Sequence, residues 1–305
     1  IYPEKVWGIK TNQMLPDWAP KRVRLVQDRE PFFGNQYAGV CSKGTGYLFE
    51  KIIDILELKG HKTYFNSEIS GIEQHLSRIT GIILSDSVRI PVGHSDLVVG
   101  TIPVSKMSSL LGSSFHMPFR GISSTYISYD DCKHVLPEPY HWLYFSDPEI
   151  SFNRITEPTK LAPALSLLGS GRTYIICETT FDSGDFESQV DAEKTIEATL
   201  AGLNKTFLRQ YSISSVSTNI EPYVYPIQTH SNKLLYKQAE SFLGSYVNLE
   251  FLGTAANYAY NDLQVIFKQA KELARDLIDD CRGFTSLSRS SYASNLCVQD
   301  FEAPL

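Results

Sequence analysis

The stretch from Asn248 to Ile278 reads NLEFLGTAANYAYNDLQVIFKQAKELARDLI and carries the strongest structural signal in the chain. Its short apolar run, from Leu249 to Leu252, ends at Gly253, which is typical of a buried strand followed by a turn. Asn261 or Asp262 can then cap a helix. The apolar residues of that predicted helix recur at helical spacing and would form one face: Leu263, Ile266, Phe267, Ala270, Leu273, Ala274, Leu277 and Ile278.

A strand, a glycine turn and a capped helix together place free backbone N–H groups and the positive end of the helix at one point. This arrangement favours an anion, or the electron-rich edge of a ring, in front of the helix. An ordinary terminal helix packed on a sheet explains the same pattern. Composition alone favours that second interpretation.

The composition is that of a globular protein of 305 residues, long enough for one large or two ordinary domains. With 28 basic and 34 acidic residues the formal charge is −6, so no overall basic field predicts a nucleic-acid partner. No apolar run approaches the roughly 20 residues that span a bilayer, so we expect no membrane span.

The cysteines and histidines indicate a reducing compartment and no structural metal. The five cysteines are odd in number, far apart and without a C-x-x-C pair, which argues against a disulfide framework or a zinc site. The seven histidines show no H-E-x-x-H and no paired ligand spacing. We therefore expect a cytoplasmic protein without a metal.

Hydrophobic periodicity predicts a mixed chain of helices and strands. A helix is expected from Gly46 to Lys59, with Gly60 as its stop. The continuous apolar strand Asp96–Thr101 is typical of a parallel sheet covered on both faces, and a short helix is expected over Ser105–Leu111. The strands predicted between these elements lie near His61–Phe65, Glu68–Glu73, Ile79–Leu84 and Ser87–Pro91.

From about Gly121 to Tyr225 the pattern alternates, as in antiparallel strands of a second sheet. Two amphipathic helices are expected over Gln189–Arg209 and Ser231–Leu243. The chain after Gly283 is rich in serine and lacks periodicity, so we expect it to be irregular. The strands predicted in the alternating region are Ser123–Tyr129, His141–Phe145 and Tyr174–Phe181.

Gly253, Tyr258, Tyr260 and Asp262 have the spacing of the C-terminal flavin segment of UDP-galactopyranose mutases, a family that this chain resembles. Other motifs of the family match in the same order, and the resemblance extends to about residue 280. The segment Asp96–Pro103 also resembles a strand shared with protoporphyrinogen oxidases and amine oxidases. The remaining matching segments are Tyr2–Gly8, Asp17–Val23, Lys43–Tyr47, Trp142–Phe145 and Phe152–Glu157.

The resemblance implies an α/β (α+β) fold, the FAD/NAD(P)-binding Rossmann-like flavoprotein fold, with an antiparallel-sheet substrate domain. The chain has no G-x-G-x-x-G fingerprint, which in this fold holds the cofactor pyrophosphate on a helix end. We therefore expect the fold to be incomplete at the N-terminus. The implied divisions are a helical part of the substrate domain (1–40), FAD-domain segments (41–112 and 226–282), the antiparallel-sheet substrate domain (113–225) and an irregular tail (283–305).

The resemblance implies FAD as the cofactor. The loop before the last helix would lie against the pyrimidine edge of the flavin, where a helix N-terminus offers N–H donors to the negative charge of the reduced ring. Gly253 would let the backbone approach the cofactor, although a plain turn also explains it. The cofactor-binding residues implied by the resemblance are Ile69, Thr101, Gly253, Asp262, Leu263 and Gln264.

For the substrate, the resemblance implies binding by Arg120, Arg154, Tyr258 and Tyr260. A guanidinium in an enclosed cleft can bind two oxygens of a phosphate or carboxylate at once. Internal salt bridges, for instance between Arg154 and Glu157, explain the arginines equally well. The two tyrosines could equally face a core and the surface.

Three departures from the mutase pattern argue against a strict mutase. The arginine that follows the glycine in the family is Thr254 here, the arginine between the tyrosines is Ala259, and the final aspartate is Gln264. In mutases the second of these arginines grips the substrate diphosphate. Its loss removes a charge-assisted contact worth roughly 1.5–3 kcal/mol.

These features predict an FAD-dependent oxidoreductase-type flavoenzyme that acts on a small-molecule substrate of unidentified structure. In such enzymes the flavin supplies the reaction, and the protein supplies orientation and electrostatics. A flavin-dependent sugar-nucleotide mutase is the first alternative, with a sugar nucleotide as its substrate. A non-catalytic scaffold that has lost FAD is the second. No residue stands out as a general base, so no catalytic residue is assigned.

Overall fold

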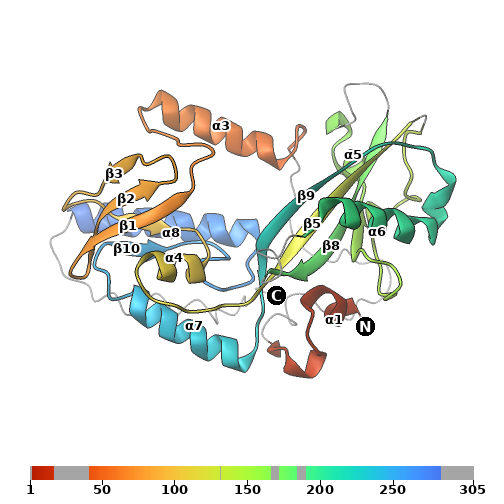
Figure 1. The fold of residues 1–305 in the computed structure, drawn as a ribbon. Coiled ribbons are helices and arrows are strands. Elements are labelled where there is room, and N and C mark those ends of the chain that lie inside the picture. The colour runs from red at the N-terminus through yellow and green to blue at the C-terminus, as the bar shows by residue number, and fades with distance from the viewer. Residues whose placement is uncertain (1, 17–40, 131, 166–171, 184–189, 283–305) are drawn as a thin grey trace, which may run out of the picture. The chain divides into compact units, whose positions relative to one another are not determined.

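The computed structural model describes residues 2–16, 41–130, 132–165, 172–183 and 190–282 (Figure 1). The chain divides into two compact units, Ile1–Tyr260 and Asn261–Leu305, and each is described by itself. The first unit holds all three sheets, and the second holds the long helix α8 (Leu263–Arg282). The predicted irregular tail, and residues 17–40 of the predicted helical part, lie outside the described residues.

The largest sheet has five antiparallel strands in the order β6-β7-β8-β5-β9 (Figure 1). The three strands predicted for this region are confirmed as β5, β6 and β8. The sequence pattern does not predict β9, because its serines, threonine and asparagine leave few apolar positions; pairing with β5 along most of its length holds it in place. The strands are β5 (Phe119–Tyr129), β6 (Trp142–Tyr144), β7 (Arg154–Thr156), β8 (Thr173–Asp182) and β9 (Ile213–Pro226).

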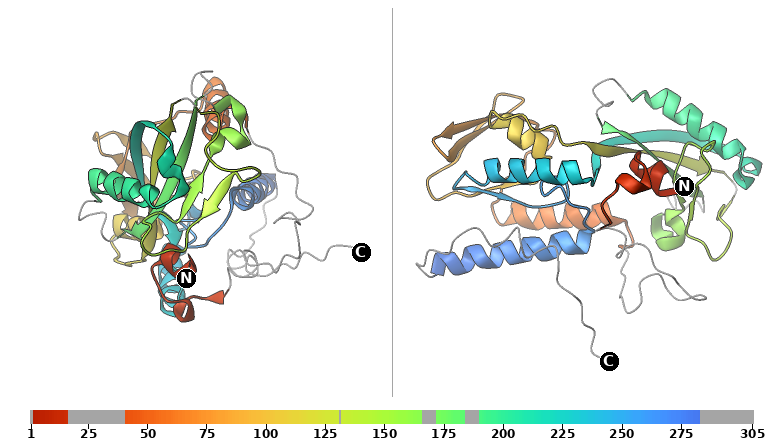
Figure 2. Two further views of the ribbon diagram at one scale, coloured as in Figure 1. Left: turned by 90° about the vertical axis from the view of Figure 1, so that its right-hand side faces the viewer. Right: turned by 90° about the horizontal axis from the view of Figure 1, so that it is seen from below.

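One face of this sheet is covered and the other is only partly buried. Along β5 the odd-numbered side chains are buried, whereas the even-numbered ones after Arg120 are partly exposed. Helix α6 (Ala192–Asn204) and the short helix η6 (Phe207–Gln210) supply the cover, and α6 packs on β5 and β9 (Figures 1 and 2). The core between them contains Ile127, Tyr129, Ile150, Phe152, Ile155, Ile175, Cys177, Leu203 and Leu208.

The second sheet is a small antiparallel meander in the order β1-β2-β3, and its strands match three of the predicted ones. The strand predicted at His61–Phe65 is wrong, because that segment has no regular structure and the first strand begins at Ile69. Tyr64 and Phe65 are exposed in this segment, so packing against a neighbouring strand does not stabilise an extended conformation there. The meander consists of β1 (Ile69–His75), β2 (Arg78–Leu84) and β3 (Arg89–Pro91).

The third sheet pairs β4 (Val98–Gly100) with β10 (Leu249–Phe251) in parallel, which confirms both strands. Its cover comes from α4 (Val104–Leu110) and α7 (His230–Leu243), which pack against each other (Figure 2). The expected cover on both faces is not found in the described part of the chain, since Val99 is 40% exposed. The core beside this pair includes Ile79, Val104, Met107, Leu111, Phe119, Ala239, Leu243 and Leu249.

Helix α3 (Thr45–Leu58) confirms the helix predicted from Gly46, but its apolar side chains are not buried. No residue of α3 is fully buried, and Leu58 is 88% exposed. Helix α1 (Tyr2–Trp7), at the N-terminus, packs against β8. The remaining short helical segments are η1 (Thr11–Gln13), α5 (Pro158–Leu161) and η3 (Pro163–Leu165).

Candidate functional site

The partly exposed face of the five-stranded sheet carries a row of polar side chains. The ladder sets Tyr144 opposite Arg154 and Arg154 opposite Glu178. It continues from Glu178 to Ser124 and from Ser124 to Asn219. Residues directly opposite each other on neighbouring strands point to the same face, so these five side chains cross the whole sheet in one line.

Arg154 and Glu178 form the charged centre of this row. Nη2 of Arg154 donates to Oε1 of Glu178 over 2.6 Å. Burial lowers the pKa of Arg154, but the hydrogen bonds to Glu178 and to Tyr144 outweigh it, so that pKa lies above its ordinary value. Nε of Arg154 is buried without a hydrogen-bond partner. A buried unpaired donor costs free energy, so the site retains capacity for one more acceptor.

Aromatic rings gather around this charged pair, and four of them come from outside the sheet row. Tyr2 meets Tyr144 edge to face, with ring centroids 5.3 Å apart. The ring centroid of Trp7 lies 5.4 Å from that of Tyr225 and 5.6 Å from that of Tyr260, and the ring centroids of Tyr225 and Tyr260 are 5.4 Å apart. Spacings of this kind are the favoured ones for aromatic pairs.

Tyr2 and Tyr225 stay protonated at ordinary pH. Burial is the main cause that raises the pKa of Tyr2 and of Tyr225. Neighbouring groups that affect these hydroxyls include Arg154 and Glu178, which places the aromatic cluster beside the charged pair. A protonated phenol both donates and accepts a hydrogen bond, so the cluster offers neutral polar contacts between apolar ring faces.

Arg120 has a mainly structural set of partners. It is 7% exposed and pairs with Asp182 across β5 and β8. Its Nε donates to the carbonyl of Val6 over 3.2 Å, and its Nη2 donates to Oγ1 of Thr180 over 3.1 Å. Gly8 lies directly on the guanidinium, since an added Cβ would be 2.8 Å from Nη1. Arg120 therefore ties the end of α1 to the sheet, and its predicted contact with substrate stays a prediction.

Lys5 anchors the same helix at a second point. Its ammonium donates to the carbonyls of Phe145, Asp147 and Phe152, over 3.1, 3.0 and 2.7 Å. Burial lowers the pKa of this amine. These contacts hold Tyr2 and Trp7, which flank Lys5 on α1, against the sheet.

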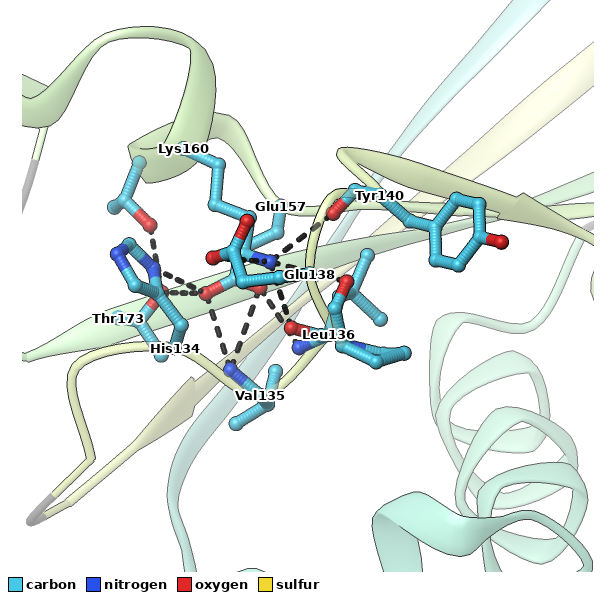
Figure 3. Close-up of polar contacts among 10 residues, drawn as sticks. His134, Val135, Leu136, Glu138, Tyr140, Glu157, Lys160 and Thr173 are labelled. Atoms are coloured by element: carbon cyan, nitrogen blue, oxygen red, sulfur yellow. Dashed lines mark hydrogen bonds and ion pairs between the residues drawn. The ribbon is translucent and has the colours of Figure 1, made fainter. Parts of the chain in front are cut away.

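Arg154 does form the internal salt bridge that was the alternative to substrate binding, but its partner is Glu178 and not Glu157. Glu157 does not pair with Arg154 but lies fully buried and accepts from the backbone N–H groups of Val135 and Leu136 (Figure 3). The hydroxyl of Thr173 donates to it over 2.7 Å, and Nδ1 of His134 lies 3.1 Å away. The carboxylate therefore fixes the loop that leads into β6.

Lys160 fixes the next part of that loop. Its ammonium donates to the carbonyls of Leu136 and Tyr140 over 2.7 and 3.1 Å, and it lies 3.1 Å from the carboxylate of Glu138 (Figure 3). Glu157 and Lys160 thus hold the loop directly before β6, and the pairing of β6 with β7 then sets Tyr144 opposite Arg154.

Two of the three predicted cofactor residues of the first unit, Thr101 and Gly253, lie at the parallel strand pair, and the third, Ile69, lies in the antiparallel meander. Thr101 follows the end of β4, and Gly253 follows β10 by two residues, so both lie at the carboxyl edge of the pair. The N–H of Leu252 donates to the carbonyl of Gly100 over 3.1 Å, which brings these two exits together. Gly253 has φ of +98° with open space around it, a conformation that favours glycine. Ile69 starts β1 opposite Leu84.

Tyr258 and Tyr260 have different surroundings. Tyr258 is 3% exposed in the core beside the parallel pair, and its hydroxyl lies 2.7 Å from the carbonyl of Pro118 and 3.0 Å from that of Ile227. Its ring stacks on Tyr236 at 5.9 Å. Tyr260 instead belongs to the aromatic cluster. The structure thus brings Tyr260 together with Trp7 and Tyr225 and gives Tyr258 packing partners.

Asp262, Leu263 and Gln264 belong to the second unit. The carbonyl of Asp262 accepts from the N–H groups of Val265 and Ile266, over 3.0 and 3.2 Å, and α8 begins at Leu263. Asp262 therefore occupies the N-cap position, for which the sequence offered Asn261 or Asp262. The predicted contact of these three residues with FAD stays a prediction.

The described residues contain neither a membrane-spanning helix nor a cluster of metal-binding side chains. None of the helices is long and apolar enough to cross a membrane. The described ranges also contain no group of three or more histidine, cysteine, aspartate or glutamate side chains arranged to hold a metal ion.

Neither a family model nor a curated protein matches the chain, but solved structures do. The chain is similar to a reduced UDP-galactopyranose mutase, with a TM-score of 0.71 and 18% identity over 94% of this chain and 64% of that one. It is also similar to a protoporphyrinogen oxidase-like protein from Exiguobacterium sp. 255-15, with a TM-score of 0.55 and 14% identity over 78% of this chain and 52% of that one.

These comparisons establish the fold. The chain has the mixed helix-and-sheet fold of the FAD-binding, Rossmann-like flavoproteins, with an antiparallel sheet, as the resemblance implied. At identities of 18% and 14%, the similarity supports a conclusion about the fold and about nothing further. The chain spans 64% and 52% of the length of these two structures.

Sequence reasoning names Arg154 and Tyr260 but misses several neighbours that the structure adds to the site: Tyr2, Trp7, Tyr144, Glu178 and Tyr225. Tyr2, Trp7 and Tyr144 do lie inside segments that resemble the mutases, which is a usable signal. Glu178 has no local signal, because only the register between β7 and β8 brings it to Arg154.

Proposed function

We propose that this chain supplies the substrate-binding sheet and part of the cofactor-binding region of an FAD-dependent oxidoreductase-type flavoenzyme. The main support is the likeness to the reduced mutase, which extends over 94% of the chain at a TM-score of 0.71. FAD is the cofactor in this proposal, and it would supply the electron transfer. The protein would orient a small-molecule substrate on the row that contains Arg154 and Glu178.

The carboxyl edge of β4 and β10 supports the cofactor part of the proposal. Ligands of open α/β sheets bind beyond the carboxyl ends of parallel strands. Thr101 and Gly253 lie at that edge, and Gly253 has no side chain that would keep a ligand from its backbone. In this proposal the Gly253 backbone approaches the flavin.

An FAD titration of the purified protein tests the cofactor assignment. We expect saturable quenching of flavin fluorescence, and we expect Gly253→Ala to weaken FAD binding about tenfold, which corresponds to about 1.4 kcal/mol. Gly112→Ala is the matched control, because Gly112 also has a positive φ, +86°, and open space around it, but lies at the end of α4. Binding that is absent, or equally weakened by both substitutions, would refute the assignment.

A sugar-nucleotide mutase is the second candidate, since the structure with the TM-score of 0.71 is a UDP-galactopyranose mutase. Turnover of a UDP-sugar only in the presence of a reductant would favour this candidate over an oxidoreductase. Thr254 and Ala259 stand where that family has arginines, which argues against it. A scaffold without FAD would remain colourless and would show no quenching in the titration.

A further inference from the structure

Among the described residues, the cations nearest the aromatic cluster are engaged by other groups of the protein. Arg154 is paired with Glu178 at 2.6 Å, and Arg120 is paired with Asp182. Lys5 donates to three backbone carbonyls. The described residues around the cluster therefore offer two charge-neutral pairs and a saturated ammonium, and they offer no unpaired positive charge to an incoming anion.

Apart from Nε of Arg154, the free hydrogen-bonding capacity of the site lies in a carboxylate oxygen and in neutral hydroxyls. Within the described part of the chain, Glu178 uses one carboxylate oxygen for Arg154, and Oε2 has no hydrogen-bond donor. The hydroxyls of Tyr2 and Tyr225 are protonated, because burial raises the pKa of both. A ligand hydroxyl can donate to Oε2 of Glu178 and accept from a phenol at the same time.

The shape of the surroundings favours a ring. Tyr144 on β6 and Trp142 two residues before it are both partly exposed, on the face that carries Arg154. Tyr126 on β5 is also exposed and lies 6.5 Å from the ring of Tyr174. Apolar ring faces beside polar groups suit a ligand that is apolar on its faces and hydroxylated at its rim.

We propose that this face binds an uncharged, hydroxylated ring of the neutral-sugar class, and that it discriminates against phosphate- and diphosphate-bearing ligands. The proposal rests on the proposed function for the view that this sheet is the substrate site. Discrimination follows because an anion would have to compete with Glu178 and Asp182 for guanidinium groups that are already paired. Glu178 is then a specificity-determining residue, which repels phosphate and accepts from a hydroxyl.

Binding measurements on the whole protein test this proposal directly. The neutral probes are methyl β-D-glucopyranoside and methyl β-D-galactopyranoside, and the anionic probes are UDP and inorganic pyrophosphate. Saturation-transfer NMR detects the weak glycoside complexes, and isothermal titration calorimetry ranks the affinities. We expect at least one glycoside to bind more tightly than either anion. Stronger binding of UDP or pyrophosphate, or no glycoside binding at all, would overturn the proposal.

Glu178→Gln tests the assigned role of the carboxylate. Freed of its counter-charge, Arg154 should bind pyrophosphate at least tenfold more tightly, and glycoside binding should fall at least tenfold. Glu221→Gln is the control, because Glu221 lies on β9 of the same sheet, opposite Ile122, and is exposed. It should change neither affinity. If folded Glu178→Gln binds pyrophosphate and the glycoside with the affinities of the wild type, the assigned role of Glu178 is refuted.

The outcome is separable from that of the FAD titration. FAD binding without glycoside binding overturns this inference and leaves the proposed function in place. If Glu178→Gln does not fold, the ranking of the four probes on the wild-type protein still decides the substrate class.

Discussion

At the scale of single residues, Glu157 shows how a buried charge can serve geometry without taking part in chemistry. Its carboxylate is fully buried and accepts from two backbone N–H groups and from the hydroxyl of Thr173 (Figure 3). Burial of a charge is tolerated only when it is hydrogen-bonded in this way. The network holds the loop before β6 and, through it, the position of Tyr144.

Glu157→Ala should therefore lower the free energy of unfolding by about 3 kcal/mol, because it leaves buried N–H groups without acceptors. Urea denaturation followed by circular dichroism measures this change. Glu138 belongs to the same network, but its side chain is 77% exposed. Glu138→Ala should therefore leave the urea midpoint of unfolding unchanged. Equal midpoints for the Glu157 variant and the wild type would contradict the packing role.

At the scale of elements, two helices of the same length differ in how far their apolar side chains are buried. Helices α3 and α7 each have 14 residues and an apolar face. Leu243 at the end of α7 is 1% exposed in the core, whereas Leu58 at the end of α3 is 88% exposed. Amphipathic periodicity is similar in both helices, and packing partners decide which face is buried.

The same substitution in the two helices should therefore change the free energy of unfolding by different amounts. Leu243→Ala should lower the free energy of unfolding by about 2–5 kcal/mol through lost burial and a residual cavity. Leu58→Ala should change it by less than about 0.5 kcal/mol. Thermal and urea unfolding of both variants provide the measurement. A comparable loss for Leu58→Ala would mean that another surface covers the end of α3.

At the scale of the whole molecule, the described elements form two compact units, with the boundary between Tyr260 and Asn261. All three sheets and both core clusters lie in the first unit. A unit with its own cores is expected to fold by itself.

A fragment of residues 1–260 should therefore unfold in one cooperative transition with a midpoint close to that of the whole chain. Differential scanning calorimetry tests this expectation. A broad, non-cooperative transition would contradict the independent folding of this unit.

The local pattern of the sequence was sufficient for most helices and for the strands with strong apolar runs. Helix α3, the strand pair β4 and β10 and the start of α8 after Asp262 follow from periodicity, glycine and capping residues. It failed for β9, whose polar residues give no local signal, and at His61–Phe65, where strand-forming residues find no partner strand.

The sequence by itself thus determined the class of fold, because collinear motifs and apolar periodicity are local properties. Only the tertiary structure decided the site. Arg154 and Glu178 are 24 residues apart and become partners through the β7–β8 register, and Trp7 reaches Tyr225 and Tyr260 only after α1 docks on the sheet. Strand register and docking depend on contacts between distant segments, which a local pattern does not contain.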